Sequence, residues 1–341
     1  YNYKEMVELL IAKGADMNLQ NKWGTTALMI ASRDDYKEVA EVLIARGADV
    51  NLQDKDGWTA LMFASMSYCK EAKEAVKVLI EAKADVNWQD EYGRTALMEA
   101  IINNCKEAVE VLIAKGANVN LQDKWGCTNI IELTRENDIE GIKRLIEEGA
   151  DLNLQDNEGW TALMEASINN CKEMVEVLIK AKADVNLRDN WGTTALIWAS
   201  RNDCKEAVEV LIEEGADVNL RDKDGWTALI WASKNNCKET VEVLIKAKAD
   251  VNLQDQWSET ALIWASRDDY KEVVEVLIAK GADVNWQDED GWNALIWASY
   301  RNNKKVAEVL IEKGADVNLQ DNKGWTALML ASCNDNKEMV E

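Results

Sequence analysis

A pattern with a period of about 33 residues recurs along nearly the whole chain, and it limits the possible folds more than any other feature. The segment at residues 54–61 reads DKDGWTAL, and its register returns at Asn21, Asp90, Asp123, Asp156, Asp189, Asp222, Asp255, Asp288 and Asp321. Every interval has the same length except the one from Asp54 to Asp90, which is three residues longer. A fixed period of this length is typical of a solenoid, in which each unit buries its apolar face only against its neighbours.

The repeat that opens at Asp222 begins with a turn and a short helix. Positions are counted as slots from the opening Asp or Asn, so Asp222 is slot 1. Gly225 at slot 4 predicts a turn, because glycine adopts positive φ at little cost. Thr227 at slot 6 is expected to cap a helix over residues 228–233, since a threonine oxygen can accept a free amide of the first turn.

A second helix is expected over residues 238–247, with Val241, Leu244 and Ile245 on its buried side. The two asparagines before it predict the end of the first helix, because asparagine tolerates the left-handed conformation.

A turn followed by two helices in a repeat of this length resembles the ankyrin repeat. The family pattern Asp-x-x-Gly-x-Thr-Pro-Leu-His-x-Ala-Ala appears at residues 156–167 as DNEGWTALMEAS, and its Gly-Ala-Asp-Val-Asn ending appears at residues 47–51. The resemblance covers the whole chain, although the chain contains no Pro and no His. It implies an all-α solenoid with β-hairpin tips, built as a single array over residues 1–341.

The resemblance divides the array into nine full repeats and a partial repeat at each end. The full repeats span residues 21–53, 54–89, 90–122, 123–155, 156–188, 189–221, 222–254, 255–287 and 288–320, and the partial ones span 1–20 and 321–341.

Two departures from the pattern predict local weakness. Lys83, Lys182 and Lys248 replace the glycine that follows the second helix, and positive φ there would cost each of them about 1 kcal/mol. The repeat at residues 123–155 diverges most, with Asn129 in place of Ala and Gly141 inside the second helix. Because a helical glycine costs about 1 kcal/mol, we predict that this repeat is the softest joint.

Charge and hydropathy limit the possible partners. The formal net charge is −23 and the pI is near 4.5, so the surface repels phosphate backbones and anionic membranes and attracts basic partners. No apolar run approaches the roughly 18 residues that span a bilayer. We expect neither nucleic acid nor a membrane as a partner.

The seven cysteines are expected to be reduced. Cys171, Cys204 and Cys237 occupy the same slot in successive repeats, which stacking places about 10 Å apart, beyond the ~7 Å limit for a disulfide. An odd count without paired spacing predicts a reducing intracellular compartment, the cytoplasm in particular.

Catalysis is not expected. Without histidine, Ser-His and Cys-His dyads cannot form, and no zinc, calcium, P-loop or dinucleotide motif is present. We expect no enzyme activity, no cofactor and no metal.

Each tip carries one aromatic residue in the first part of the repeat. Slot 3 holds Trp23, Tyr92, Trp125, Trp191 and Trp257, and slot 5 holds Trp58, Trp160, Trp226, Trp292 and Trp325. Residues two apart on an extended strand share a face, so we expect these rings to form one surface. In ankyrin proteins such positions commonly face partners, and the resemblance implies the same here. A second interpretation stays open, in which each ring packs on the neighbouring hairpin and stiffens the array.

Slot 10, in the first helix, is the second candidate surface. It holds Glu99, Glu132 and Glu165 in three successive repeats and Trp198, Trp231, Trp264 and Trp297 in the next four. A slot that accepts Glu three times is not expected to be deeply buried. We predict a groove that is acidic in its middle and lined by Trp in its C-terminal half. Packing of these Trp rings between adjacent first helices is the alternative.

These features favour a non-catalytic scaffold that binds a protein or peptide on the concave face of hairpins and first helices. Where slot 5 is Trp, slot 3 is usually acidic, and aromatic rings beside carboxylates suit a partner rich in Lys or Arg. Two alternatives stay open. One is a structural spacer, or a segment of a longer protein that assembles end to end through uncapped terminal repeats. The other is a regulatory module fused to an enzyme outside this segment.

Overall fold

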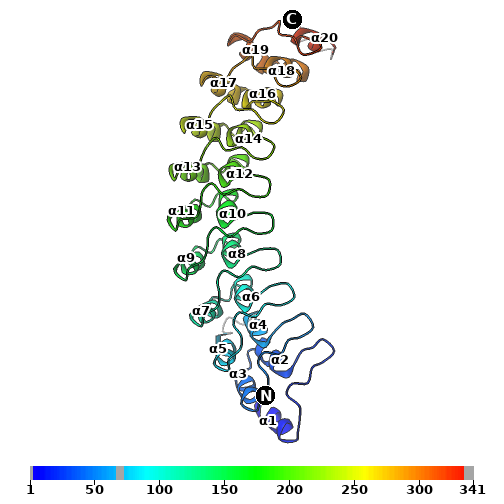
Figure 1. Cartoon of the computed structure of the whole chain (residues 1–341), viewed down its shortest axis with the longest axis vertical. Helices are drawn as coiled ribbons and strands as arrows, with labels where there is room; N and C mark the ends of the chain where they lie inside the picture. Colours follow the sequence, from blue (N-terminus) through cyan, green and yellow to red (C-terminus); the bar gives the residue numbers. More distant parts are fainter. Residues whose placement is uncertain (1–2, 67–72, 334–341) are drawn as a thin grey trace. The chain divides into compact units, whose positions relative to one another are not determined.

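The computed structural model describes residues 3–66 and 73–333, in which each repeat contributes two short helices (Figure 1). The first helices are α2 (Ala27–Arg33), α4 (Ala60–Ser65), α6 (Ala96–Ile102), α8 (Asn129–Arg135), α10 (Ala162–Ile168), α12 (Ala195–Arg201), α14 (Ala228–Lys234), α16 (Ala261–Arg267), α18 (Ala294–Arg301) and α20 (Ala327–Cys333). The second helices are α1 (Tyr3–Ala12), α3 (Lys37–Ala45), α5 (Lys73–Glu81), α7 (Lys106–Ala114), α9 (Ile139–Glu147), α11 (Lys172–Lys180), α13 (Lys205–Glu213), α15 (Lys238–Lys246), α17 (Lys271–Ala279) and α19 (Lys304–Glu312).

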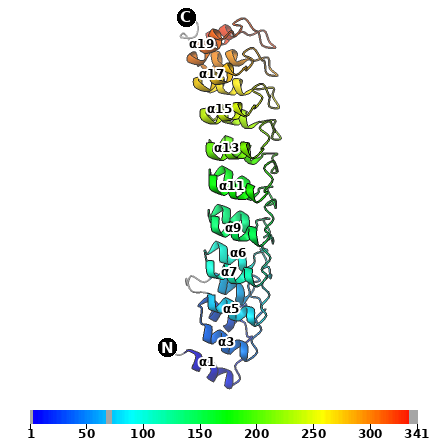
Figure 2. The ribbon, with the colours of Figure 1, turned by 90° about the vertical axis from the view of Figure 1, so that its left-hand side faces the viewer.

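The chain divides into two compact units, residues 1–157 and 158–341, and each is a stack of repeats. In the first unit α2, α4, α6 and α8 pack one on the next, and α1, α3, α5 and α7 form a second row. In the second unit α10, α12, α14, α16, α18 and α20 form one row, and α11, α13, α15, α17 and α19 form the other. Within each unit the loops that join the repeats lie together on one side of the helices (Figure 2). The all-α solenoid is confirmed, and the single array over both units stays a prediction.

Both helices predicted in the repeat that opens at Asp222 are present, with starts as predicted and ends within one residue of the prediction. The Thr227 hydroxyl oxygen accepts a hydrogen bond from the amide of Ile230 at 3.2 Å, which caps α14. A cap of this kind contributes about 1 kcal/mol. The helix ends before Asn236, whose φ of 61° reverses the chain toward α15.

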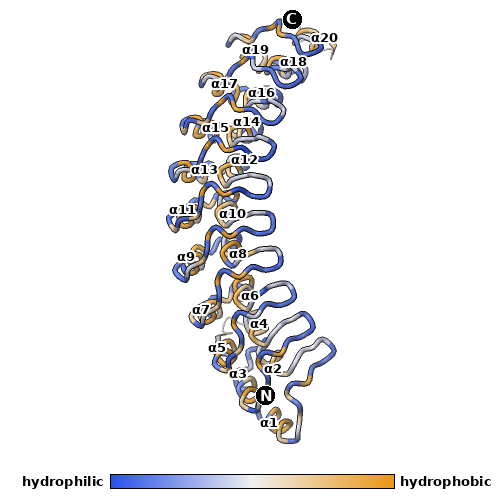
Figure 3. Tube along the Cα trace, viewed as in Figure 1, coloured by the Kyte–Doolittle hydropathy of each residue, from blue (hydrophilic) through white to orange (hydrophobic). Residues whose placement is uncertain are grey.

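The core lies between the two rows of helices. In α15, Val241 and Leu244 are fully buried and Ile245 is half-buried. The leucine equivalent to Leu244 is buried in each second helix after α1, at Leu43, Leu79, Leu112, Leu145, Leu178, Leu211, Leu244, Leu277 and Leu310. Apolar segments accordingly mark the helices, and hydrophilic segments mark much of the connecting loops (Figure 3).

The tips are turns held by hydrogen bonds rather than long hairpins. Among the described residues, strand pairing is limited to isolated bridges between slots 33 and 6: Gln53 with Thr59, Gln122 with Thr128 and Gln254 with Thr260. Neighbouring tips are joined instead by a backbone hydrogen bond from slot 2 to the slot 3 carbonyl of the preceding repeat. The amide of Lys223, for example, donates to the carbonyl of Trp191 at 2.9 Å.

A ladder of asparagines at slot 31 ties successive repeats together below the tips. The Asn219 side-chain oxygen accepts from the amide of Asp250 at 2.9 Å, and the Asn252 oxygen accepts from Asp283 at the same distance. The Asn252 amide group also donates to the carbonyl of Gly281 at 3.2 Å. Each asparagine therefore satisfies backbone groups of the next repeat that no helix or strand would satisfy.

The predicted departures have local structural consequences. Lys83, Lys182 and Lys248 adopt positive φ, as expected, with values of 67°, 73° and 68°. A Cβ at Gly141 would lie 2.8 Å from Asp138 Oδ2 and 3.0 Å from Leu133 Cδ2, so a larger residue there would displace these two side chains. The Asp138 carboxylate caps α9 by accepting the Gly141 amide at 3.1 Å. That this repeat is the softest joint stays a prediction.

The glycine at slot 4 allows adjacent tips to approach closely. Gly159 has φ 84°, and a Cβ there would lie 2.7 Å from the amide nitrogen of Asn190 in the next repeat. Gly215, which follows α13, has φ 91° but has nothing within 4 Å of the equivalent position. The two glycines share their backbone requirement and differ in their surroundings.

We expect Gly159→Ala to destabilise the protein by about 1–3 kcal/mol more than Gly215→Ala. Both alanines carry the cost of positive φ, but only the first forces apart two backbones, and overpacking costs about 1–3 kcal/mol. Urea unfolding followed by circular dichroism measures the difference. Equal losses in the two variants would contradict the role assigned to close approach.

Candidate functional site

The carboxylate at slot 1 shapes each tip. Asp222 Oδ1 accepts hydrogen bonds from the amides of Asp224 at 3.0 Å and Trp226 at 2.8 Å. The same pair of bonds, from slots 3 and 5, recurs at Asp54, Asp90, Asp123, Asp189, Asp255, Asp288 and Asp321 and at Asn21. Each of these tips is therefore closed around one oxygen atom, with slot 3 at the outside of the turn.

The aromatic side chains at slot 3 are exposed. Their exposed fraction runs from 36% at Tyr92 to 61% at Trp23, with Trp125, Trp191 and Trp257 between these values. In the first unit Tyr92 and Trp125 stack with their planes 3° apart and their centroids 6.1 Å apart. The Lys124 ammonium lies 3.9 Å from the Tyr92 ring centroid.

The aromatic side chains at slot 5 turn inward, so the prediction that slots 3 and 5 share one surface is wrong. Trp226 is only 4% exposed and packs between Trp231 and Trp264. Its ring centroid lies 4.4 Å from that of Trp231 and 4.6 Å from that of Trp264. Trp58, Trp160 and Trp292 are half-buried, and Trp325 is exposed on the last described repeat. The reason is the positive-φ residue at slot 4, which reverses the chain between the two slots, whereas an extended strand would keep them on one face.

The four tryptophans at slot 10 are fixed by the slot 1 carboxylate of their own repeat. The indole Nε1 of each donates to Oδ2 of that aspartate: Trp198 to Asp189 at 2.8 Å, Trp231 to Asp222 at 3.2 Å, Trp264 to Asp255 at 3.0 Å and Trp297 to Asp288 at 3.0 Å. One oxygen of the carboxylate holds the turn and the other orients a ring on the first helix. Burial raises the pKa of Asp222 and of Asp288, and the backbone and indole donors partly oppose that effect.

Basic side chains at slot 13 cover these rings. Arg201 lies over Trp198 and Trp231, with its guanidinium carbon 5.2 and 4.3 Å from their centroids. The Lys234 ammonium lies 4.5 Å from Trp264 and 4.6 Å from Trp226. Arg267 continues the series over Trp264 at 4.7 Å and Trp297 at 4.4 Å. We call Trp198, Trp231, Trp264 and Trp297 with Arg201, Lys234 and Arg267 the indole–cation ladder.

Slot 10 is more buried than its glutamates suggest, so the prediction that it lies near the surface is wrong at two positions. Glu99 is 3% exposed and Trp264 is 8% exposed, whereas Glu132 and Glu165 are half-buried. The Glu99 carboxylate is compensated by Arg94 at slot 5, whose Nη1 lies 2.9 Å from its Oε1. Burial nevertheless raises the pKa of Glu99, against the field of that guanidinium.

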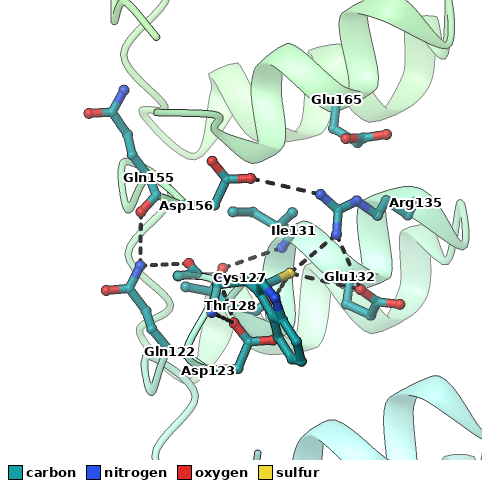
Figure 4. Close-up of polar contacts among 12 residues, drawn as sticks. Gln122, Asp123, Cys127, Thr128, Ile131, Glu132, Arg135, Gln155, Asp156 and Glu165 are labelled. Atoms are coloured by element: carbon teal, nitrogen blue, oxygen red, sulfur yellow. Dashed lines mark hydrogen bonds and ion pairs between the residues drawn. The ribbon is translucent and has the colours of Figure 1, made fainter. Parts of the chain in front are cut away.

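The divergent repeat pairs its glutamate differently (Figure 4). Arg135 Nη1 lies 3.6 Å from Glu132 Oε2 and 3.4 Å from Cys127 Sγ, and Nη2 lies 3.9 Å from Asp156 Oδ2. Burial raises the pKa of the Cys127 thiol to about 12, so this sulfur stays a neutral thiol rather than a nucleophile. Residues at slots 5, 10 and 13 thus form one polar cluster here, whereas slot 10 is Trp in the four repeats that open at Asp189, Asp222, Asp255 and Asp288.

Two hollows open beside the tips of the second unit. The larger, of about 390 Å³, is lined by Trp257, Glu259, Arg267, Asp288, Glu289 and Asp290 together with two rings of the ladder. The smaller, of about 240 Å³, is lined by Asp290, Trp292, Trp297, Asp321, Lys323 and Trp325, among others. These hollows bring predicted aromatic site residues together with carboxylates. The slot 3 carboxylate of Asp290 beside Trp292 was expected from the sequence, whereas Glu259, Asp288 and Asp321 were not expected there.

Glu259 lies in the larger hollow and is 6% exposed. Its carboxylate pairs with Arg267 at 3.3 Å. Burial raises the pKa of Glu259 from about 4.5 to about 7; the charges of Asp255 and Asp288 add to the rise, while Arg267 and Lys234 oppose it. The hollow therefore holds more negative charge than its own cations balance.

Several structural residues of the site were missed by sequence analysis. Trp88 and Trp286, each two residues before the next repeat opens (slot 32 in a repeat of 33 residues), donate their indole hydrogens to the carbonyls of Gly57 at 2.9 Å and Ser258 at 2.8 Å. The signal was present, because slot 32 is Leu in the other repeats. The cations at slot 13 were also predictable, since they follow the slot 10 tryptophans by three residues on a helix.

Neither a metal-binding cluster nor a membrane-spanning helix is present in the described residues. Within residues 3–66 and 73–333, no group of three or more Cys, Asp or Glu side chains is placed to hold a metal ion. No helix in those ranges is both long and apolar enough to cross a bilayer. Six cysteines are free thiols, and Cys69 lies outside the described residues. The cytoplasmic location of the protein stays a prediction.

Glu259→Gln is expected to remove a pH dependence of stability. A raised folded-state pKa means that the folded protein binds the proton more tightly, so Glu259 makes the protein less stable as pH rises from about 4.5 to about 7. The free energy of unfolding of the variant, relative to that of wild type, should therefore increase between about pH 4.5 and about pH 7, by on the order of 2 kcal/mol. Urea unfolding at several pH values measures it.

Glu259→Thr is the matched variant, because Thr193 occupies the same slot of an earlier repeat. If both variants keep the wild-type pH dependence, the proton is not taken up at this carboxylate.

The comparison with known families agrees with this architecture. A family model described as ankyrin repeats, in three copies, matches residues 1–87, 47–123, 130–222, 215–288 and 262–341. No individual curated protein matches the chain significantly. The family matches leave only residues 124–129, in the divergent repeat, uncovered. The chain belongs to the ankyrin repeat family.

Proposed function

We propose that this chain is a protein-interaction scaffold that binds a basic segment of a partner protein across the tips and first helices of residues 158–341. Ankyrin repeats generally mediate protein–protein interactions, and proteins built from them are typically non-enzymatic scaffolds. What supports a basic partner is the chemistry of the exposed slot 3 side chains.

These side chains alternate between carboxylate and indole along the second unit as far as the repeat that opens at Asp288, and the last described repeat has Lys323 at slot 3. Slot 3 is in turn Glu158, Trp191, Asp224, Trp257 and Asp290, all of them exposed. We call this set the tip row. An indole face flanked by carboxylates attracts ammonium and guanidinium groups both through the ring quadrupole and through charge.

The tip row is held in register by the backbone. The carbonyls of Glu158, Trp191 and Asp224 each accept the slot 2 amide of the next repeat, at 2.9, 2.9 and 2.8 Å, and those of Trp257 and Asp290 do the same at 3.2 and 3.1 Å. A fixed backbone limits the entropy that the exposed side chains lose on binding. This regular, exposed row is the single observation that carries the proposal.

The indole–cation ladder is not expected to bind the partner directly, which leaves the tip row as the docking surface. Arg201, Lys234 and Arg267 already lie over the slot 10 rings, so those ring faces are satisfied within the chain. A basic partner is therefore expected on the tip row, with the ladder beneath it as support. The net charge of −23 favours approach of such a partner over long range, to an extent that salt reduces.

We expect the double variant Trp191→Ala, Trp257→Ala to bind Lys/Arg-rich peptides about tenfold more weakly than wild type. Each exposed ring contributes roughly 0.5–1 kcal/mol to a bound cation. Isothermal titration with a pool of such peptides, at 50 and 300 mM salt, measures this. Tyr36→Ala is the control, since Tyr36 is an exposed aromatic away from the tips, at the start of α3.

Two results would contradict the proposal: wild type shows no salt-sensitive binding to the pool, or the control loses as much affinity as the double variant.

Self-association is a second candidate, favoured by the exposed apolar side chains of the terminal helices. On α1 the side chains of Met6, Leu9 and Leu10 are exposed, beside an apolar hollow of about 320 Å³, and on α20 those of Leu328 and Met329 are exposed. Apolar faces of this kind favour association.

Sedimentation velocity of the 341-residue chain over a hundredfold concentration range tests self-association. Under this candidate the sedimentation coefficient rises with concentration, because the ends of separate molecules cover each other. A sedimentation coefficient that stays at the monomer value at every concentration would rule out self-association.

A further inference from the structure

The two hollows of the second unit share a wall. Asp290 and Trp297 line both of them, so the hollows lie on either side of the repeat that opens at Asp288. Asp290 is exposed, and its amide donates to Asp288 Oδ1 at 3.0 Å, which holds it at the outside of the turn. The hollows are therefore neighbouring compartments of one surface, one on each side of a single tip.

Both compartments suit a positive charge. Between them they contain the carboxyl groups of Glu259, Asp288, Glu289, Asp290 and Asp321, against the two basic side chains Arg267 and Lys323. Arg267 is committed to Glu259 and to the ladder rings. The carboxyl groups toward the tips thus outnumber the cations that could neutralise them.

Each compartment contains aromatic rings that are not covered by a basic side chain of the described residues of this unit. The ladder stops at α18, because slot 13 there is Tyr300 where Arg or Lys stands in the three preceding repeats. Among the described residues of this unit, no basic group lies over Trp257 in the larger compartment or over Trp292 and Trp325 in the smaller one. Trp257 and Trp325 are also exposed.

The repeat sets the distance between the compartments. Packed helices lie about 8–10 Å apart, so equivalent points of successive repeats are separated by about that distance. A polyproline II segment has three residues per turn and rises about 3.1 Å per residue, so its residues i and i+3 share a face about 9 Å apart. On such a segment, residues that are adjacent or two apart neither share a face nor lie about 9 Å apart.

We propose that the two compartments form a paired receptor for two basic side chains three residues apart on a polyproline II segment of the partner. One side chain enters between Trp257 and the carboxylates of Glu289 and Asp290. The other enters between Trp292 and Trp325, beside Asp321. This inference rests on the proposed function and makes it specific, since it assigns the partner a spacing and a backbone conformation.

Three fluorescent peptides of identical composition test the spacing, with the cores Arg-Pro-Pro-Arg, Arg-Pro-Arg-Pro and Arg-Arg-Pro-Pro in the same flanking sequence. Fluorescence anisotropy with the whole chain should show the first binding at least fivefold more tightly than either of the others. Their charges are equal, so a purely electrostatic attraction cannot produce the difference.

Asp290→Asn tests the shared wall. It should weaken binding of the Arg-Pro-Pro-Arg peptide at least fivefold and bring the three peptides to similar affinity. Asp56→Asn is the matched control, because Asp56 is an exposed slot 3 carboxylate of the first unit, lies outside the tip row and lines neither compartment. It should change the affinity less than twofold. Thermal unfolding of both variants checks that they fold as wild type does.

The outcomes separate this inference from the proposed function. Equal, salt-sensitive binding of the three peptides to wild type would overturn the spacing and leave the basic partner in place. An equal loss in the two variants would overturn the assignment to these compartments. If none of the three peptides binds, both the paired receptor and the basic partner are wrong.

Discussion

The carboxylate that opens each repeat is the group on which the tips depend. One oxygen of Asp222 accepts two backbone amides and closes the turn, and the other accepts the indole hydrogen of Trp231. Hydrogen bonds to a charged group contribute about 1.5–3 kcal/mol each, and more is lost when one partner is left buried alone. The same residue therefore fixes the outer surface of the repeat and the orientation of the ring beneath it.

Repetition turns this local arrangement into a surface. Glycine at slot 4 allows close approach between tips, as at Gly159, and Ser258 keeps the positive φ of the turn in the one repeat that lacks the glycine. The backbone bonds between tips and the asparagine ladder then hold slot 3 side chains at regular intervals within each unit. The tip row and the two compartments beside Asp290 follow from that regularity, because charge and aromatic area recur at the spacing of the repeat.

The tryptophans differ in exposure in a way that composition does not reveal. Trp226 and Trp264 are buried, and Lys234 lies over both of them, so they stabilise the array. Trp191 and Trp257 are exposed at the tips and are available to a partner. The two interpretations of the tip aromatics therefore apply to different slots, the packing role to slot 5 and the candidate docking role to slot 3.

The period, the helices, the threonine caps and the left-handed turn at Asn236 could be predicted from the sequence, because they depend on neighbours within a few positions. Which rings are buried could not be predicted, because their burial depends on how the chain folds back and stacks. Trp257 and Trp226 look equivalent in the sequence, yet the slot 4 reversal places one outside and the other between two helices. The pairing of Trp264 with Asp255 across a turn, and its cover by Lys234 from the previous repeat, also depend on how the repeats stack. The conformational preference of a residue says nothing about contacts across a turn or between repeats. Those contacts decide which side chains of the site are buried and which charged groups lie beside them.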